Sequence, residues 1–517
     1  MDSLRISQNG RYFVKPDGAP FPWIADTAWT VPARLKWDDV LYYLKTRKRQ
    51  GFTVLQMVVL DPEFNPDMKN PSGIPALRNG NLQERNPEYF DYVDWVLDQA
   101  EKEEFYVLLL PVWGQLVTGD DWGGGHYDKI VDETNAFAYG AWLGEREKRR
   151  KNILWCLGGD RMPIHKGIDY RMVWRKMAEG LAYGLTGERL SWNRDREKWS
   201  KILMTYHTCH EMETGRCSTF SYWTEDDAWI RFIMLQSGHG MEVHNDELIR
   251  QEHIRHPDMP VWDGESAYEA MPSEWPITDR TSFHGADVVR KKSYPALFSG
   301  AFGYTYGHAS VWCSISEKER NAVTGKTWEE ALDSPGAWEV KVLRDFLEAY
   351  PAETFIPCED LCMFRDSGNK RIRNGRQACV SGDRRILLAY YPEIVEDDIN
   401  LRVLQSGGIK GLEESVNRIH KNFTCAADRT PDFQYAWFDP SDGSVSESTF
   451  VSGNDVQEGW WEVPVPTGQD SRNALVLIVE FCDLKGKDQL HGINVVSGTY
   501  GAKEEKSVAR KVFDWGE

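Results

Sequence analysis

Two acidic residues follow apolar runs in the same way, although they lie far apart in the sequence. Asp160 ends the run LWCLGGD (154–160), and Glu265 ends the run VWDGE (261–265). In both runs glycine stands directly before the acid, where the missing Cβ lets the backbone approach a ligand closely or adopt positive φ angles. A pair of opposed carboxyl groups is the minimum apparatus for hydrolysing a glycosidic bond. The sequence predicts this chemistry if the two runs converge in the fold.

The two carboxyl groups need different protonation states for this reaction. One must hold a proton near neutral pH, and apolar walls such as Trp113 and Trp155 would favour that state by desolvation. The other must stay ionised to attack or stabilise the anomeric carbon. A structural interpretation is also open, in which Asp160 caps the following helix and Glu265 pairs with a buried arginine.

Two further acids compete for these roles. Asp263 lies two residues before Glu265 and shares its strand face, unless a bulge at Gly264 breaks the alternation. Asp26 ends the first apolar run of the chain. A carboxylate at that position could equally bind sugar hydroxyls, so both roles stay open for Asp26.

An alternation of apolar runs and amphipathic helices must position these residues. The runs are short and nearly continuous in apolar character, as in a parallel sheet that is buried on both faces. A doubly wound open sheet is the rival fold, but no glycine-rich phosphate loop follows the first run, and eight units are the number that closes a (β/α)₈ barrel. We therefore predict the barrel. The eight runs span 21–29, 52–61, 105–114, 153–160, 202–209, 232–239, 259–266 and 302–312, and the helices between them include 37–50, 86–104, 170–185, 245–256 and 287–300.

Polar or aromatic side chains stand at the C-terminal end of nearly every run. Because the strand ends of a barrel converge on one mouth, we expect these side chains to form a single site there. The expected residues are Asp26, Trp29, Asp61, Trp113, Asp160, His207, Gln236, His239, Asp263, Glu265, Tyr304 and His308.

The character of the chain changes near residue 350. Residues 327–351 predict a closing helix, and short β-like runs follow it, with a hairpin signal of Pro-Ser-Asp-Gly at 440–443. We therefore predict a barrel domain over 1–351 and an all-β sandwich domain over 352–517. No element is predicted for 393–432 or for the charged C-terminal end.

The composition excludes several classes of partner. A net charge of −19 argues against nucleic acid and anionic membrane surfaces, because both repel an acidic protein. No run is long and apolar enough to span a membrane and no secretory signal is seen, so we expect a cytoplasmic protein. Nine cysteines without a C-x-x-C pair fit reduced thiols, and no cofactor or metal is predicted. The oligomeric state is not predicted.

Several motifs in chain order resemble those of one known family, the apiosidase-like glycoside hydrolases of family 140. They are PFPWIADTAW (20–29), ILWCLGGD (153–160), TYH (205–207), MLQSGH (234–239), PVWDGESAYE (260–269) and GYTYGHASVW (303–312). The resemblance implies a (β/α)₈ catalytic barrel, a retaining mechanism and a furanoside substrate. The tail around WFDPSDG (437–443) resembles a small C-terminal β domain that is sometimes labelled collagen-binding.

The resemblance also implies residue roles. It assigns Asp160 as general acid and base and Glu265 as nucleophile, the same pair that the residues themselves suggest. The glycine-rich loop at 115–129 and the segment after His207 depart from the family pattern, which leaves the sugar and its leaving group open. The sugar contacts that it implies are His207, Gln236, His239, His308 and Trp312.

We expect a retaining, exo-acting glycoside hydrolase that releases a terminal furanoside, above all β-linked apiose from plant glycan fragments or apiosylated glycosides. An arabinofuranosidase or a galactofuranosidase is the alternative within this class. A carbohydrate-binding protein without activity on the same fold is the alternative from another class. A metal hydrolase that uses His207, His239, His308 and Asp26 would lack the H-x-H or H-E-x-x-H spacing of such sites.

Overall fold

The computed structural model describes most of the barrel and the central strands of the C-terminal domain. Most of the unassigned segment 393–432, the charged C-terminal end and part of the glycine-rich loop at 115–129 lie outside the described residues. The described residues are 1–62, 65–120, 127–274, 277, 281–320, 324–358, 375–383, 385–393, 400–402, 432–455, 460–463 and 474–481.

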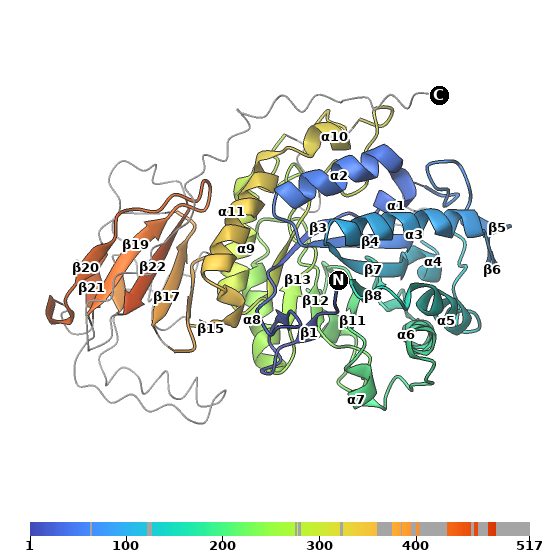
Figure 1. Cartoon of the computed structure of the whole chain (residues 1–517), viewed down its shortest axis with the longest axis horizontal. Helices are drawn as coiled ribbons and strands as arrows, with labels where there is room; N and C mark the ends of the chain where they lie inside the picture. The colour runs from blue at the N-terminus through green and yellow to red at the C-terminus, as the bar shows by residue number, and fades with distance from the viewer. Residues whose placement is uncertain are drawn as a thin grey trace.

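Eight parallel strands form the barrel that the sequence predicts, one within each of the eight apolar runs. Helices cover the outside of these strands (Figure 1). In order around the barrel the strands are β3 (Trp23–Thr27), β4 (Val54–Leu60), β7 (Tyr106–Val112), β8 (Ile153–Gly158), β11 (Met204–His207), β12 (Ile233–Leu235), β13 (Val261–Asp263) and β14 (Gly303–Tyr306).

The barrel closes through two hydrogen-bonded groups of strands. Six strands form one sheet in the order β11-β8-β7-β4-β3-β14, and β12 pairs with β13. Single backbone hydrogen bonds join the two groups. The N–H of Arg231 donates to Met204 O (2.8 Å), and the N–H of Phe302 donates to Val261 O (3.0 Å). The (β/α)₈ prediction is confirmed.

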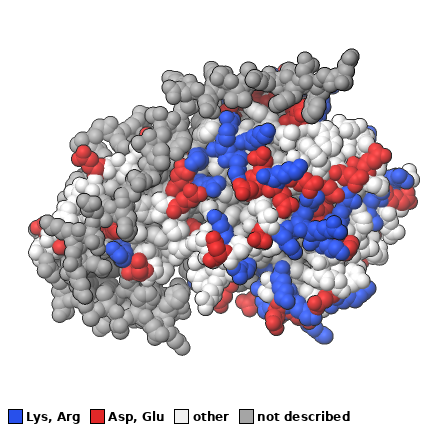
Figure 2. Space-filling model, in the orientation of Figure 1, with Lys and Arg blue, Asp and Glu red and all other residues white. Residues whose placement is uncertain are grey.

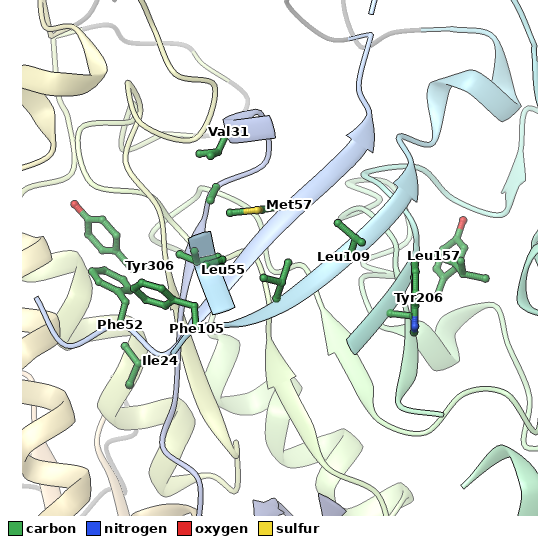
Figure 3. Packing of buried hydrophobic residues seen from close by; sticks show 14 of the residues in the cluster. Ile24, Val31, Phe52, Leu55, Met57, Phe105, Leu109, Leu157, Tyr206 and Tyr306 are labelled. Atoms are coloured by element: carbon green, nitrogen blue, oxygen red, sulfur yellow. The ribbon is translucent and has the colours of Figure 1, made fainter. Parts of the chain in front are cut away.

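The side chains of each strand alternate between the barrel interior and the helix layer, so the barrel has two apolar layers. Val58 and Leu108 belong to the interior cluster. Leu55 and Leu109 belong to the cluster between the strands and the helices (Figure 3). This alternation decides which of the predicted site residues can reach the mouth.

All five helices predicted between the strands form. The predicted closing helix is divided in two, and one further helix was not predicted. The interval 327–351 holds two helices, α10 (Trp328–Ala331) and α11 (Pro335–Ala349), because the residue before a proline avoids helical angles. No helix was predicted at α5 (Ala136–Glu147), where Gly140 and Gly144 hide the pattern but allow close packing on α6. The predicted helices are α2 (Trp37–Arg49), α3 (Pro87–Lys102), α6 (Arg171–Thr186), α8 (Asn245–Arg255) and α9 (Asp287–Phe298).

Short elements decorate the barrel. Three antiparallel hairpins and three one-turn helices lie in its N-terminal segment and loops. They are β1 (Arg5–Ile6) with β2 (Phe13–Val14), β5 (Leu77–Arg78) with β6 (Asn81–Arg85), β9 (Ile164–His165) with β10 (Ile168–Asp169), and α1 (Val31–Arg34), α4 (Gln115–Thr118) and α7 (Arg196–Trp199).

In the described part of the C-terminal domain the elements are β-strands and short 3-10 helices, in agreement with the predicted β domain. Its described part is a six-stranded antiparallel sheet in the order β15-β16-β17-β22-β19-β20 and a separate pair, β18 with β21. The predicted turn at 440–443 forms a hairpin, since Phe438 bridges Val445. The strands are β15 (Ile356–Pro357), β16 (Gln377–Val380), β17 (Ile386–Tyr391), β18 (Asn400–Arg402), β19 (Phe433–Phe438), β20 (Thr449–Val451), β21 (Trp460–Glu462) and β22 (Leu475–Phe481).

One face of this six-stranded sheet packs on α9 and α11 of the barrel (Figure 1). Tyr294 of α9 stacks on Tyr390 of β17 with ring centroids 5.7 Å apart, and Phe346 of α11 contacts Phe438 of β19 at 4.9 Å. Alternate residues such as Ala389 face a separate apolar cluster on the other side of the sheet. The first face therefore shares one continuous core with the barrel.

Basic and acidic side chains are interspersed on the face of the molecule that Figure 2 shows. Arg146 of α5, for example, pairs with Asp91 and Asp94 of α3, at 2.6 Å in each case. The net negative charge therefore does not gather into one patch on this face. Within the described part of the chain, no helix has the length and apolar character needed to cross a membrane.

Candidate active site

The last residue of β8 and the two residues after it have positive φ angles, and this turn directs Asp160 into the barrel mouth. The φ angles are +88° at Gly158, +106° at Gly159 and +52° at Asp160. A Cβ at Gly158 would lie 2.2 Å from the carbonyl oxygen of His207, and one at Gly159 would lie 2.9 Å from the ring of Trp113. Glycine suits both the angles and the space. The two glycines thus place Asp160 directly against the ends of β7 and β11.

We expect Gly158→Ala to destabilise the protein more than the same change at Gly187. Both glycines have positive φ angles, +88° and +75°, so alanine costs about 1 kcal/mol of backbone strain at either position. Only at Gly158 does the new Cβ also meet a carbonyl oxygen, whereas nothing lies within 4 Å at Gly187. Chemical denaturation should show an additional loss of about 1–3 kcal/mol for Gly158→Ala. Equal losses in the two variants would contradict the close packing of this turn.

Glu265 and Asp263 have different surroundings, although they lie two residues apart. Asp263 accepts hydrogen bonds from the hydroxyl of Ser237 (2.6 Å) and the amide of Asn245 (3.1 Å). Its other oxygen accepts from the backbone N–H of Ser237 (3.2 Å). The regular strand ends at Asp263, and Gly264 then breaks the alternation. Asp263 therefore fixes the loop after β12, which leaves Glu265 as the acid at the mouth.

The imidazole ring of His207 contacts both acidic residues. Its Nδ1 accepts a hydrogen bond from the backbone N–H of Asp160 (3.3 Å), and its Nε2 lies 3.3 Å from Oε2 of Glu265. Because Nδ1 is the acceptor, the proton of the neutral ring is on Nε2 and faces Glu265. One ring thus joins the acid after β8 to the acid after β13.

Gln236 and His239, which follow β12, complete the surroundings of the two acids. Nε2 of Gln236 donates to Oδ1 of Asp160 (2.8 Å), and the same amide lies beside Glu265. Nε2 of His239 lies 3.6 Å from Oε1 of Glu265. The structure therefore brings Asp160, Glu265, His207, Gln236 and His239 into one group.

The two carboxyl groups have pKa values that shift in opposite directions. Burial raises the pKa of Asp160; the guanidinium of Arg161 opposes this, and the negative charge of Glu265 adds to it. Burial also acts to raise the pKa of Glu265, but the N–H of His207 and the nearby His239 outweigh it, so this pKa lies below its ordinary value. Asp160 is therefore the acid that retains a proton more readily, and Glu265 is the one that stays ionised.

An aromatic wall lies beside this pair. Trp29 stacks on His207 with ring centroids 5.3 Å apart, and Trp113 contacts both Trp29 (5.4 Å) and His207 (5.8 Å). The side chains of Asp160 and Glu265 are 17% and 9% exposed, so a ligand can reach both. A carboxyl pair with opposite pKa shifts beside aromatic rings has the groups needed for acid-assisted cleavage of a glycosidic bond.

A comparison with protein families agrees with this geometry. The family described as "Apiosidase-like, catalytic domain" matches residues 7–354, which hold the whole barrel and both acids. The chain belongs to the apiosidase-like family. It is a glycoside hydrolase, and its substrate is a carbohydrate. The comparison with curated proteins gave no match.

Solved structures of other glycoside hydrolases show the same overall fold. One, titled "Glycoside hydrolase", is 23% identical with a TM-score of 0.70, and the alignment covers 93% of this chain and 97% of that one. Another is a glycoside hydrolase family 5 protein from Bacteroides vulgatus ATCC 8482, also 23% identical with a TM-score of 0.70, with 93% and 92% covered. Because these alignments extend well beyond residue 354, the shared fold includes the β domain.

Three side chains from the sequence prediction face away from the mouth of this glycoside hydrolase. Asp26 accepts hydrogen bonds from Tyr43 and from Nε of the buried Arg47 (2.6 Å). Tyr304 and Trp155 belong to the cluster between the strands and the helices. The alternation of side chains along each strand explains all three orientations, since these residues occupy positions that face the helix layer. Asp26 and Tyr304 are therefore not retained as sugar contacts, and Trp155 does not desolvate Asp160.

His308 and Trp312 lie in the loop after β14. His308 is buried, its Nδ1 accepts from the backbone N–H of Ser310 (3.0 Å), and burial lowers its pKa to about 3, so it is neutral. This hydrogen bond gives His308 a structural role in the loop. Trp312 packs against the interior cluster that holds Trp29 and Trp113, which keeps it as a candidate for sugar contact.

Two residues at the site were missed by the sequence reasoning. Arg161 donates to the backbone oxygen of Asp160 (2.6 Å) and to its Oδ2 (3.2 Å). The ring of Tyr268 lies 4.5 Å from that of His239, and burial together with the charge of Glu265 raises its pKa. Their proximity in sequence to the two acids, in GGDR and GESAY, is the signal that could have identified them.

Across the residues that the structure describes, no cluster of three His, Cys, Asp or Glu side chains is arranged to hold a metal ion. His207 and His239 instead both approach Glu265, as neighbours of a carboxylate.

Proposed function

We propose that this enzyme is a retaining, exo-acting glycoside hydrolase of the family 140 type that releases a terminal furanoside. Asp160 acts as general acid and base, and Glu265 acts as nucleophile. The observation that carries the proposal is the contact of one imidazole ring, that of His207, with both acidic residues. The opposite pKa shifts of the two carboxyl groups agree with these roles.

The reaction takes place in two displacements. In the first, a carboxylate oxygen of Glu265 bonds to the anomeric carbon while the bond to the leaving oxygen breaks, and that oxygen takes the proton of Asp160. In the second, the Asp160 carboxylate removes a proton from water, whose oxygen attacks the anomeric carbon and displaces Glu265. Each displacement inverts the anomeric centre, so the released sugar keeps its original configuration.

Several side chains are suited to hold the sugar in this mechanism. The aromatic faces of Trp29 and Trp113 suit the C–H face of a sugar ring. Nε1 of Trp113 and Oε1 of Gln236 are buried without a hydrogen-bond partner among the described residues. Buried polar groups normally have partners, so sugar hydroxyls are natural ones here. His239 and Trp312 complete the set of proposed contacts.

The sugar we propose is β-linked apiose, from small apiosylated glycosides or plant glycan fragments. Nitrophenyl glycosides of β-apiofuranose, α-arabinofuranose and β-galactofuranose provide the test, with kcat/KM as the readout and NMR for the configuration of the first product. We expect the apioside to be hydrolysed best, with a β-configured product. A preference for either other furanoside would overturn the choice of apiose, and an α-configured product would overturn the retaining mechanism.

The resemblance of the β domain to domains labelled collagen-binding stays a prediction. We propose that this domain braces the barrel, because a hydrogen bond connects it to the first turn of α8, which in turn holds the end of β13. Nε2 of Gln377 on β16 donates to Asp246 (2.9 Å), whose neighbour Asn245 holds Asp263 (3.1 Å). The backbone N–H of Glu265 in turn donates to Asp263 (3.3 Å).

A further inference from the structure

The side chain of Arg161 lies against Asp160 and is almost completely buried. Only 1% of the Arg161 side chain is exposed, compared with 17% for Asp160. Its Nη1 donates to the backbone oxygen of Asp160 (2.6 Å) and to Oδ2 of the same residue (3.2 Å). One nitrogen thus binds both the main chain and the side chain of the proposed acid, while the guanidinium itself is closed off from solvent.

The loop that follows β7 holds this guanidinium in place. Nη2 of Arg161 donates to Oε1 of Gln115 (3.2 Å) and to the backbone oxygen of Asp120 (3.3 Å). Gly114 makes room for the arginine, because a Cβ there would lie 2.7 Å from Cβ and Cγ of Arg161. The donors of a guanidinium form a rigid planar fork, so binding both terminal nitrogens fixes its orientation.

The carboxylate of Asp120 does not take up the charge of Arg161. It accepts from Nε2 of His165 (2.7 Å) and from Nζ of Lys166 (2.6 Å), both on the hairpin of β9 and β10. Toward the β7 loop the guanidinium therefore binds an amide oxygen and a carbonyl oxygen, and its positive charge acts on Asp160.

Asp160 needs this support because its backbone conformation is unfavourable. Its φ angle is +52°, a left-handed conformation that residues other than glycine rarely adopt. Nη1 of Arg161 holds its carbonyl group. The two carboxyl oxygens are held separately, Oδ2 by Arg161 (3.2 Å) and Oδ1 by Nε2 of Gln236 (2.8 Å). The carboxyl group therefore has a fixed direction as well as a fixed place.

Arg161 is also a fixed positive charge in a site where a negative charge moves. Before the first displacement the charge is on Glu265, and Asp160 carries the proton. In the glycosyl-enzyme intermediate Glu265 is a neutral ester, and Asp160 is the carboxylate. The negative charge therefore moves to the group that Arg161 contacts. An interaction that strengthens as the proton leaves lowers the barrier of that step.

Other titratable groups also face Asp160. Burial raises the pKa of Asp160, and Arg161 is the strongest of the charges that act on it, in the opposite direction. Glu265, after β13, adds to the rise, and His207 of β11 opposes it. Cys209, in the loop after β11, is neutral, because burial raises the pKa of its thiol well above the ordinary value. Loss of Arg161 would therefore move the titration of Asp160 to higher pH.

We propose that Arg161 is the positioning residue of the general acid, which holds the carboxyl group of Asp160 in the mouth and is its counter-ion once the proton has left. The inference rests on the proposed function, in which Asp160 donates that proton. It deepens that function, because a mechanism with two carboxyl groups does not by itself need an arginine.

The test removes the charge with methyl β-apiofuranoside as substrate, whose leaving group needs a proton. Arg161→Met should move the fall of kcat/KM at alkaline pH upward by about one pH unit or more. It should also lower kcat about tenfold or more, because the carboxyl group is no longer fixed. Arg161→Lys retains the charge and should keep the alkaline fall within about half a pH unit of wild type. Arg175→Met, which removes another largely buried arginine from Asp227 (2.8 and 3.1 Å), is the matched control and should not move it.

A second variant and a second measurement complete the test. Gln115→Glu has nearly the shape of the original residue and places a negative charge against Nη2 of Arg161. It weakens the effect of the guanidinium on Asp160, so the alkaline fall should again move upward even if Arg161→Met does not fold. NMR of protein labelled with ¹³C in its aspartate carboxyl groups follows the titration of Asp160 without turnover, and Asp160→Asn assigns the signal.

An upward titration of Asp160 in Arg161→Met or Gln115→Glu, with little change in Arg161→Lys, supports the inference even if no furanoside is cleaved, in which case the proposed function alone fails. A titration that stays in place in the first two variants, or moves as far in Arg161→Lys or Arg175→Met, would overturn the role as counter-ion. An Arg161→Met enzyme with the wild-type kcat would overturn the positioning role.

Discussion

Replacing Glu265 with alanine is expected to lower kcat for a nitrophenyl furanoside by at least about 10³-fold while the protein stays folded. The side chain is the proposed nucleophile, so its removal leaves no group to form the glycosyl ester. The fold should tolerate the change, because the backbone of Glu265 keeps its own hydrogen bonds: its N–H donates to Asp263 (3.3 Å), and its carbonyl oxygen accepts from the N–H of Gly238 (3.2 Å). Steady-state kinetics and a thermal melt of the same preparation check both parts of this prediction.

Azide distinguishes a nucleophile from a residue that merely supports the site. In Glu265→Ala the space of the missing carboxylate admits azide, which attacks the anomeric carbon directly. Rescue should therefore yield a glycosyl azide of inverted configuration, which NMR identifies. Glu242→Ala, which removes an exposed glutamate from the loop after β12, is the matched control and should retain the wild-type rate. A Glu265→Ala enzyme that turns over at near the wild-type rate would remove Glu265 from the mechanism.

The positions of the strands, and of the acids at their ends, could be predicted from the sequence because the signals are local. Apolar runs of strand length mark each β-strand, and glycine next to an acid marks a tight turn at its end. The angles at Gly158 and Gly159 bear out that interpretation of the turn. The closing helix forms, but its predicted start at 327 was wrong for an equally local reason, since Pro335 starts a new helix at a position where the apolar pattern continues.

The direction of individual side chains could not be predicted in the same way. Asp26 and Tyr304 stand near strand ends, as the site residues do, but alternation turns them toward the helix layer. In a parallel barrel both strand faces are apolar, so the sequence does not reveal which face lies inside. The sequence also could not show that His207 contacts both acids, because this contact depends on how β8, β11 and the loop after β13 meet in space.

Replacing Asp160 with asparagine should change the pH dependence of the enzyme as well as its rate. For the wild-type enzyme kcat/KM should fall as pH drops through the pKa of Glu265, which must be ionised, and fall again as pH rises through the pKa of Asp160, which must be protonated. Burial raises the pKa of Asp160, and the imidazole groups lower the pKa of Glu265. Both shifts widen the pH range in which the enzyme is active. Asparagine does not titrate, so the fall of kcat/KM at alkaline pH, the alkaline limb of the profile, should disappear.

The loss of rate in Asp160→Asn should depend on the leaving group, and this dependence separates a proton donor from a structural residue. A leaving group that departs easily needs little protonation, so the first displacement should be slowed least for dinitrophenyl glycosides and by about 10²–10⁴-fold for alkyl glycosides. Azide should again restore turnover, now with retained configuration, because Glu265 is still present to form the ester. Asp169→Asn, a change at an exposed acid of the neighbouring hairpin, is the control. An alkaline limb that persists in Asp160→Asn, or an equal loss for all leaving groups, would assign the proton to another residue.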